Sequence, residues 1–265
     1  MVNFQSMEHY GIDELRQIMA LLRSPEGCPW DRAQTHQSIR PNMLEEAYEA
    51  AEAIDEDDTE HMKEELGDVL LQVVFHAQMA QEAGRFTFDD VVDGIAKKLV
   101  FRHPYVFGTV EADDTGMALN TWEAQKQVEK GQKTASDTLD AVARSLPALI
   151  RAEKIQGKAN KAGFDWSDME PALDKVAEEA DELRRAAHGD GDPAEELGDL
   201  LFACVKAGRF LGLQSEECLH AACEKFIRRF RCVEENAPRP LSEMELPQLE
   251  ELWRQAKTQE QKSET

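Results

Sequence analysis

Apolar residues recur at three- and four-residue steps along most of the chain. Across residues 64–83 the apolar positions with this spacing are Leu66, Val69, Leu70, Val73, Val74 and Ala77. The same period continues over 139–155, 173–183, 197–211 and 218–233, and it is typical of amphipathic helices. Alternating β-branched stretches are missing, apart from a weak region at 100–110 that Pro104 and Gly108 interrupt. We therefore predict an all-α fold with about five helices in each half of the chain.

The second half of the sequence repeats the first. Four motifs occur twice in the same order, at an offset of about 130 residues: Glu-Glu-x-x-Glu, Glu-Glu-Leu-Gly-Asp, Lys-x-x-x-Arg and Trp-x-x-x-Lys. They begin at residues 45, 64, 98 and 122 in the first copy, and at 178, 195, 225 and 253 in the second. This order indicates an internal duplication. Because residues 131–137 are small and polar, we predict an N-terminal domain at 1–130 and a C-terminal domain at 138–265.

The duplicated acidic motifs predict a cluster of carboxylates in each copy. Residues three apart share a helix face, as Glu179 and Glu182 do, and as Glu196 and Asp199 do. The loop between them is rich in Gly, Asp and Pro, which predicts an antiparallel helical hairpin with the acids facing one another. The first copy offers the matching set of Glu46, Glu49, Glu65 and Asp68. Carboxylates this close must hold protons or a cation, so the pattern favours a metal site.

Simpler explanations have to be weighed against a metal site. A single Glu-Glu-x-x-Glu on a charged helix is usually a solvated face, and a single Lys-x-x-x-Arg is usually surface decoration. Leu-Gly-Asp followed by an apolar run is less common, because glycine weakens a helix by about 1 kcal/mol and an acid avoids a buried face. Repetition of the whole set in both halves favours metal binding by at least one copy.

The ligand type narrows the choice of metal. The duplicated motifs contain no histidine, whereas di-iron centres in four-helix proteins use Glu-x-x-His pairs. Coordination by oxygen alone favours Mg²⁺, with Mn²⁺ as a possible substitute. Magnesium usually keeps positions for water and phosphate oxygens, which indicates a phosphorylated substrate.

Two basic motifs suit such a substrate. Lys225 and Arg229 lie one turn apart on one helix face, and each is a candidate ligand for a polyphosphate. Trp253 and Lys257 place an indole and an ammonium over one ligand, where the indole stacks on a base or walls the pocket. The matching residues of the first copy are Lys98, Arg102, Trp122 and Lys126.

Composition restricts the classes of partner. With 53 acidic and 30 basic residues the formal charge is −23, which disfavours binding to nucleic acid polymers and to anionic membranes. We see no secretory signal at the start and no apolar run long enough to span a bilayer. The five cysteines form no CxxC pair, so we expect reduced thiols and a cytoplasmic protein.

Taken together, the motifs resemble the all-α nucleoside triphosphate pyrophosphohydrolases, and within them the MazG family. The resemblance is carried by the duplicated acidic and basic motifs, by Gly-Cys-Pro-Trp-Asp at 27–31 with Gln-Thr-His at 34–36, and by Arg-His-Pro-Tyr-Val-Phe-Gly at 102–108. It covers nearly the whole chain. It implies Mg²⁺-dependent hydrolysis of nucleoside triphosphates to monophosphate and pyrophosphate, broad base tolerance, and a housekeeping role in clearing unwanted nucleotides. It also implies a homodimer. We expect each hairpin to complete a four-helix bundle with a second hairpin, and the sequence leaves open whether that hairpin belongs to the same chain or to another.

The resemblance also assigns roles to individual residues. The four acids named above in each copy would hold Mg²⁺, and the basic and aromatic residues would contact the nucleotide. The neighbouring acids, which would orient or deprotonate the attacking water, are Glu178 and Glu195 in the second copy and Glu45 and Glu64 in the first. In such tandem proteins the C-terminal copy is expected to perform the chemistry. Here the acids of the first copy are intact as well, so the sequence leaves open which half is active.

Two other functions stay open at this point. In the first, one or both halves are a nucleotide-binding or regulatory interaction module with little catalysis. In the second, the whole chain is an acidic helical scaffold without a ligand. The mechanism we predict for the enzyme is attack of water on the α-phosphorus, with pyrophosphate as the leaving group.

Overall fold

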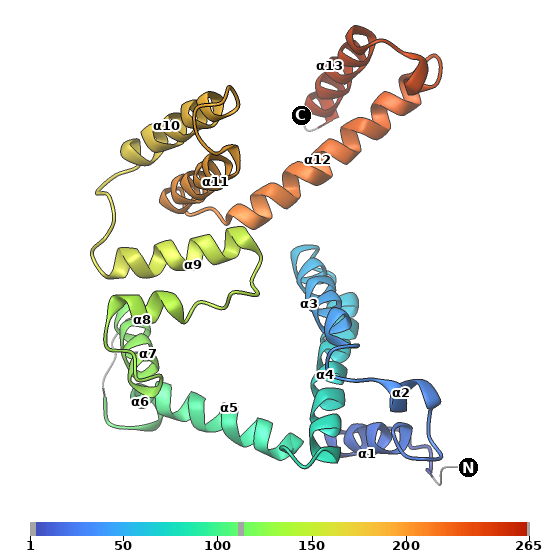
Figure 1. Ribbon diagram of the computed structural model, residues 1–265. Helices are drawn as coiled ribbons and strands as arrows, with labels where there is room; N and C mark the ends of the chain where they lie inside the picture. Colours follow the sequence, from blue (N-terminus) through green and yellow to red (C-terminus); the bar gives the residue numbers. More distant parts are fainter. Residues whose placement is uncertain (1–3, 111–113, 264–265) are drawn as a thin grey trace. The chain divides into compact units, whose positions relative to one another are not determined.

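The computed structural model describes residues 4–110 and 114–263. Regular structure in these residues is helical throughout, as predicted, with thirteen α-helices and one 3₁₀-helix (Figure 1). In chain order they are α1 (Ile12–Leu22), α2 (Pro29–Ala33), α3 (Arg40–Asp55), α4 (Thr59–Glu82), α5 (Phe88–Arg102), α6 (Pro104–Phe107), α7 (Thr115–Glu129), α8 (Ala135–Asp140), α9 (Ala148–Lys161), α10 (Glu170–Ala186), α11 (Pro193–Phe210), α12 (Ser215–Asn236), η1 (Leu241–Glu243) and α13 (Leu246–Ser263).

The chain forms two compact units, residues 1–126 and 127–265. The division falls inside α7, shortly before the small polar segment at 131–137. The two units repeat one arrangement of helices. In the first, α3 and α4 form a hairpin and α1 packs against α4; in the second, α10 and α11 form the hairpin and α9 packs against α11.

The α3–α4 hairpin of the first unit is shaped by local signals in its turn. The Asp58 side chain accepts hydrogen bonds from the backbone amides of Glu60 and His61, which caps the start of α4. At the other end of α4, Gly84 has a φ of +64° and ends the helix. The core lies between α1 and α4 and consists of Met19, Ile39, Val74, Phe75 and Met79.

The α10–α11 hairpin of the second unit has an equivalent turn. Asp192 caps α11 by accepting from the backbone amide of Ala194, and Pro193 occupies the first helical turn. Gly189 and Gly191 precede this cap at φ values of +97° and +121°, which favour glycine. Beyond the hairpin, α12 packs against α13 through a ring contact between Phe226 and Trp253.

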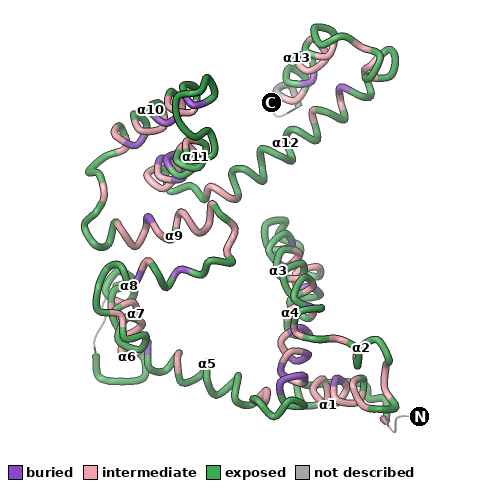
Figure 2. Tube along the Cα trace, in the orientation of Figure 1, coloured by how far each residue is buried: buried purple, intermediate pink, exposed green. Residues whose placement is uncertain are grey.

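Matched apolar side chains stay exposed in both units. On the hairpins, Leu66 and Leu70 of α4 are half exposed, and so are their counterparts Leu197 and Leu201 of α11. Figure 2 shows that α5 and α12 are exposed along most of their length, and apolar residues on them include Leu99, Val100, Phe226 and Ile227. Apolar side chains that form a continuous exposed face are typical of association surfaces.

Among residues 4–110 and 114–263, no helix combines the length and the apolar character that crossing a bilayer demands.

Candidate metal centres

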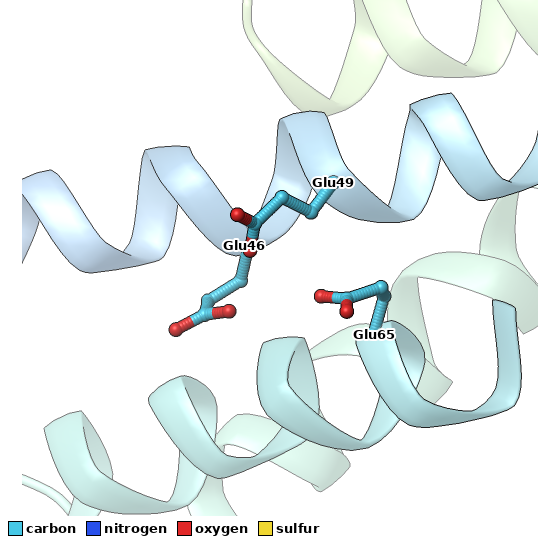
Figure 3. A group of neighbouring side chains, drawn as sticks. All are labelled: Glu46, Glu49 and Glu65. Atoms are coloured by element: carbon cyan, nitrogen blue, oxygen red, sulfur yellow. The ribbon is translucent and has the colours of Figure 1, made fainter. Parts of the chain in front are cut away.

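The hairpin of the first unit brings three of its four predicted acids together. Glu46 and Glu49 extend from α3, and Glu65 extends from α4 into the same space (Figure 3). One carboxylate oxygen from each of the three lies within 4.8 Å of the others. This geometry follows from the sequence, because a three-residue step keeps Glu46 and Glu49 on one face of α3 and the capped turn directs α4 back along it.

The charges in this first cluster are only partly compensated. The pKa of Glu46 is raised by burial and by the nearby carboxylates of Asp68, Glu49 and Glu65, while a hydrogen bond from Gln72 opposes this shift. Asp68 therefore acts on the cluster electrostatically, although it is outside the group of three. Glu65 is 8% exposed, and its Oε2 is buried with no hydrogen-bond partner. A buried carboxylate oxygen without a partner is costly, so this set suits a bound cation.

The second unit forms a corresponding cluster. Glu179 from α10 and Glu196 and Asp199 from α11 each place one carboxylate oxygen within 4.8 Å of the other two. Glu179 is 4% exposed, and its Oε2 is also buried without a partner. The fourth predicted acid, Glu182, instead forms an ion pair with Arg185 at 3.0 Å. Both clusters therefore combine crowded carboxylates with one orphaned buried oxygen, and these acids can hold a metal ion.

Electrostatics in the second cluster match those in the first. The pKa of Glu196 is raised by burial and by the carboxylates of Glu182, Glu179, Glu195 and Asp199, in that order. All four of the interacting acids come from the duplicated motifs, so the repulsion is a property of the predicted set itself.

A lysine that the sequence reasoning missed compensates part of this charge. Nζ of Lys175 lies 2.5 Å from Glu179 Oε1 and 3.0 Å from Glu178 Oε1. These two carboxylates hold the pKa of Lys175 above its usual value. Lys175 lies four residues before Glu179 on α10, and residues with this spacing lie on one helix face, so the sequence could have predicted the ion pair. The equivalent position of the first copy is Asn42, so this cation belongs to the second cluster alone.

The four predicted water-activating acids lie beside the clusters, on the exposed side. Each is the first residue of a Glu-Glu pair, so it is rotated by about 100° around its helix from the acid that faces the partner helix. All of them are exposed: Glu45, Glu64, Glu178 and Glu195.

A pocket of about 710 Å³ opens beside the second cluster. Glu179, Asp199 and Lys175 provide charged groups in its lining, and most of the remaining wall is apolar, with Phe164 and Phe202 among its aromatic residues. Its size falls in the range of sites for small molecules, and such sites typically combine an apolar wall with a few placed polar groups.

One substitution between the copies bears directly on this pocket. Lys206 lines it, forms an ion pair with Asp165, and lies 5.6 Å from the Trp166 ring centroid. Because α4 and α11 align through their Leu-Gly-Asp motifs, the equivalent residue of the first unit is Phe75. Phe75 is buried in the core under the guanidinium of Arg23. The first unit therefore has a buried aromatic ring at the position where the second unit has a charged side chain that lines the pocket.

The predicted basic and aromatic residues gather elsewhere in each unit. In the first, Arg102 lies 5.2 Å and Lys126 lies 4.7 Å from the ring centroid of Trp122, while Lys98 is half-buried on α5. In the second, the Arg229 side chain donates to Glu260 at 2.6 Å, Trp253 packs on Phe226, and Lys225 and Lys257 are exposed. Among the described residues, none from α12 or α13 lines the pocket at Glu179.

The raised carboxyl pKa values predict a pH-dependent response to metal. Because the pKa of Glu196 and of Glu46 is higher in the folded protein, the metal-free fold binds these protons more readily than the unfolded chain does. A divalent cation must displace them, so its stabilising effect falls as the pH falls. We expect the rise in melting temperature that a divalent cation induces, measured against EDTA, to shrink as the pH is lowered from neutral toward the range in which carboxyl groups titrate. A rise that grows toward acid pH would contradict this.

Comparison with known proteins connects this geometry to a family. Residues 34–107 and 168–233 each match the family described as "MazG nucleotide pyrophosphohydrolase domain". The two ranges contain all the clustered acids and both Lys-x-x-x-Arg motifs, while the Trp-x-x-x-Lys motifs lie outside them.

Relatives that are similar over nearly the whole of this chain agree with this match. A nucleoside triphosphate pyrophosphohydrolase of Escherichia coli strain K12 is 48% identical over 94% of this chain and 98% of its own length. The nucleoside triphosphate pyrophosphohydrolase/pyrophosphatase MazG of Thermotoga maritima is 47% identical over 95% of this chain and 98% of its own. The protein YabN of Bacillus subtilis, described as uncharacterized, is 46% identical over 98% of this chain and 54% of its own.

Proposed function

The chain belongs to the MazG nucleotide pyrophosphohydrolase family, and we propose that it hydrolyses nucleoside triphosphates, including deoxy forms, to monophosphate and pyrophosphate. The observation that carries this proposal is the pocket that joins an apolar wall to Glu179, Asp199 and Lys175. A nucleotide has the same two parts, an apolar base and an anionic tail that binds cations. The relatives' names, which specify nucleoside triphosphate pyrophosphohydrolase activity, support this assignment.

We assign the catalytic metal to the second cluster and propose that it is Mg²⁺, with Mn²⁺ as a substitute. Glu179, Glu196 and Asp199 would hold it, with Glu182 joining them once its contact with Arg185 is released. These are all oxygen ligands, which Mg²⁺ prefers. When bound, Mg²⁺ neutralises phosphate charge and makes water a stronger nucleophile.

The protein's own groups position the reactants. Glu178 and Glu195 are exposed beside the cluster, where either can orient the attacking water and accept its proton. Lys175 bridges Glu178 and Glu179, and its ammonium can turn to a phosphate oxygen as the substrate enters. The apolar wall of the pocket would displace water from a bound phosphate, which would strengthen each of these electrostatic contacts.

We further propose that the active form is a homodimer. The exposed pairs Leu66 with Leu70 and Leu197 with Leu201 occupy equivalent places on the two hairpins, and a second copy that covers them completes a four-helix bundle. The pocket at Glu179 is lined by α8 to α11 and the loops between them. Lys225, Arg229, Trp253 and Lys257 of a partner chain would supply the cations and the indole for the triphosphate. Arg229 must then exchange Glu260 for a phosphate oxygen.

A second function is favoured for the first unit alone. Its acids form a cluster as tight as that of the second unit, but it has Asn42 in place of Lys175 and the buried Phe75 in place of Lys206. We propose that this copy binds metal or nucleotide and supports assembly with little turnover. Lys98, Arg102, Trp122 and Lys126 would be its nucleotide contacts.

The cysteines and the proposed substrate together indicate a cytoplasmic enzyme. All five cysteines are free thiols, which suits a reducing cytoplasm. There, an enzyme that tolerates many bases would clear unwanted nucleotides.

The proposed activity is tested by incubating the full-length chain with a panel of ribo- and deoxyribonucleoside triphosphates. We expect one pyrophosphate per monophosphate from each of them with Mg²⁺, a comparable reaction with Mn²⁺, and none with EDTA. Absence of pyrophosphate from the whole panel would overturn the proposed function and leave the chain as a binding module.

A further inference from the structure

We propose that Gln156 recognises the nucleobase in the second unit, and that its side-chain Oε1 is the acceptor for a donor on the base's Watson–Crick edge. The inference rests on the proposed function, because it places a base in the pocket beside the acidic cluster. It adds a hydrogen-bonding residue for the base to a site whose other assigned polar groups act on the phosphates, the metal and the attacking water.

The hydrogen bonding of Gln156 leaves one atom without a partner. The residue lies on α9, lines the pocket and is 4% exposed. Its Nε2 donates to the backbone carbonyl of Phe202 at 2.8 Å, whereas its Oε1 is buried with no partner. A carbonyl oxygen only accepts hydrogen bonds, so this contact fixes which end of the amide faces Phe202. Oε1 is therefore an acceptor that only a ligand or a water molecule can satisfy.

The surroundings of Gln156 suit a base. Phe202 follows Asp199 by three residues on α11, so the hydrogen bond lies about one helical turn from the acidic cluster. Ile155 and Ala159 of α9 provide apolar wall. Phe164 also lines the pocket and is 82% exposed, which leaves its ring available to stack on a base. A triphosphate held at the acids thus places its base against this wall and beside Gln156.

A single acceptor at this point explains how one pocket can serve many substrates. Every common base has an N–H on its Watson–Crick edge: N6 of adenine, N4 of cytosine, N1 and N2 of guanine, and N3 of uracil and thymine. Each can donate to Oε1 after a small shift in the pocket. A base without such a donor leaves Oε1 buried and unpaired, and sites that expect a hydrogen bond discriminate strongly against ligands that cannot form it.

Purine riboside triphosphate is the probe for this inference. It matches ATP except that hydrogen replaces the 6-amino group, so its Watson–Crick edge has no N–H donor. With the wild-type full-length chain and Mg²⁺, we expect kcat/KM for pyrophosphate release to be about 10-fold or more higher for ATP than for the analogue. Equal values for the two substrates would overturn the proposal without any variant.

Two substitutions separate base recognition from the structural contact with Phe202. Gln156→Met keeps the length of the side chain and removes both the acceptor and the donor, so we expect the ATP-to-analogue ratio to fall to about 1. Gln156→Glu keeps an acceptor, and because burial favours the neutral acid, its hydroxyl can still donate to the Phe202 carbonyl. The ratio should therefore persist in Gln156→Glu.

Each outcome has one meaning. A ratio near 10 that survives Gln156→Met would assign the discrimination to another residue and overturn the proposal. If Gln156→Met does not fold, as judged by circular dichroism, the wild-type ratio and the ratio in Gln156→Glu still decide. If no triphosphate yields pyrophosphate, the proposed function itself fails; if ATP is hydrolysed but the analogue reacts equally well, only the role of Gln156 fails.

Discussion

Replacing Glu196 by glutamine should abolish turnover, whereas the same change at Glu65 should leave it nearly intact. The two residues occupy equivalent positions in the Glu-Glu-Leu-Gly-Asp motifs, and each belongs to a carboxylate cluster. Loss of a residue that only supports a metal ligand typically costs about 10- to 100-fold in activity or metal affinity. Because Glu196 is a proposed ligand itself, we expect kcat/KM for dATP to fall by at least about 100-fold. For Glu65→Gln we expect less than about a threefold change, because we assign that copy little turnover.

Stability measurements on the same two variants separate metal binding from folding. Burial and the neighbouring carboxylates raise the pKa of Glu196, so a neutral side chain there avoids the cost of burying a charge and relieves repulsion in the metal-free protein. The melting temperature of Glu196→Gln in EDTA should equal or exceed that of the wild type, and its rise with Mg²⁺ should be smaller. An active Glu196→Gln variant together with an inactive Glu65→Gln variant would move the chemistry to the first unit.

Placing a charge on the exposed face of the hairpins should dissociate the proposed dimer. Leu70 and Leu201 are equivalent residues, and their side chains are 40% and 46% exposed in the isolated chain. An aspartate buried at an interface without a partner is strongly unfavourable. In sedimentation equilibrium, we expect the double variant Leu70→Asp/Leu201→Asp to have the molecular mass of one chain, 29.9 kDa. The wild type should have twice that mass. Pyrophosphate release should be lost with the dimer, because Lys225 and Arg229 would come from the partner.

Leu246 provides a matched control for the dimer experiment. It is an exposed leucine at the start of α13, outside both hairpins. Leu246→Asp adds the same kind of charge to the surface and should leave the mass and the activity unchanged. A double variant at Leu70 and Leu201 that stays dimeric, or one that is active as a monomer, would show that these faces do not complete the site.

Much of this organisation could be predicted from the sequence because it depends on local periodicity. The helical step of apolar residues predicts the hairpins, and the three-residue spacing of Glu46 and Glu49 predicts that they share a face. The loop before Asp192 indicates the turn that sets α10 against α11. Repetition then distinguishes a functional set of acids from ordinary charged surface, since a solvated face has no reason to recur in the same order.

The pocket could not be predicted in the same way, since it depends on packing between segments far apart in the chain. Gln156 acquires its unpartnered Oε1 only because α9 lies against α11 and Phe202 takes the amide's donor. The spacing of residues within α9 does not predict that contact. Lys175 and Lys206 could have been identified from the sequence, since alignment of the two copies shows that Asn42 and Phe75 occupy the equivalent positions in the first copy. Their role becomes clear only from the structure, in which Lys175 and Lys206 line a pocket and Phe75 is buried in the core.

The position of the bond that breaks tests the central claim most directly. The full-length chain is incubated with dATP and Mg²⁺ in water enriched in ¹⁸O, and the products are separated and weighed by mass spectrometry. Our account predicts dAMP that carries one ¹⁸O atom, with unlabelled pyrophosphate in equal amount, because water attacks the α-phosphorus. Label in pyrophosphate, or the appearance of dADP with labelled orthophosphate, would contradict it.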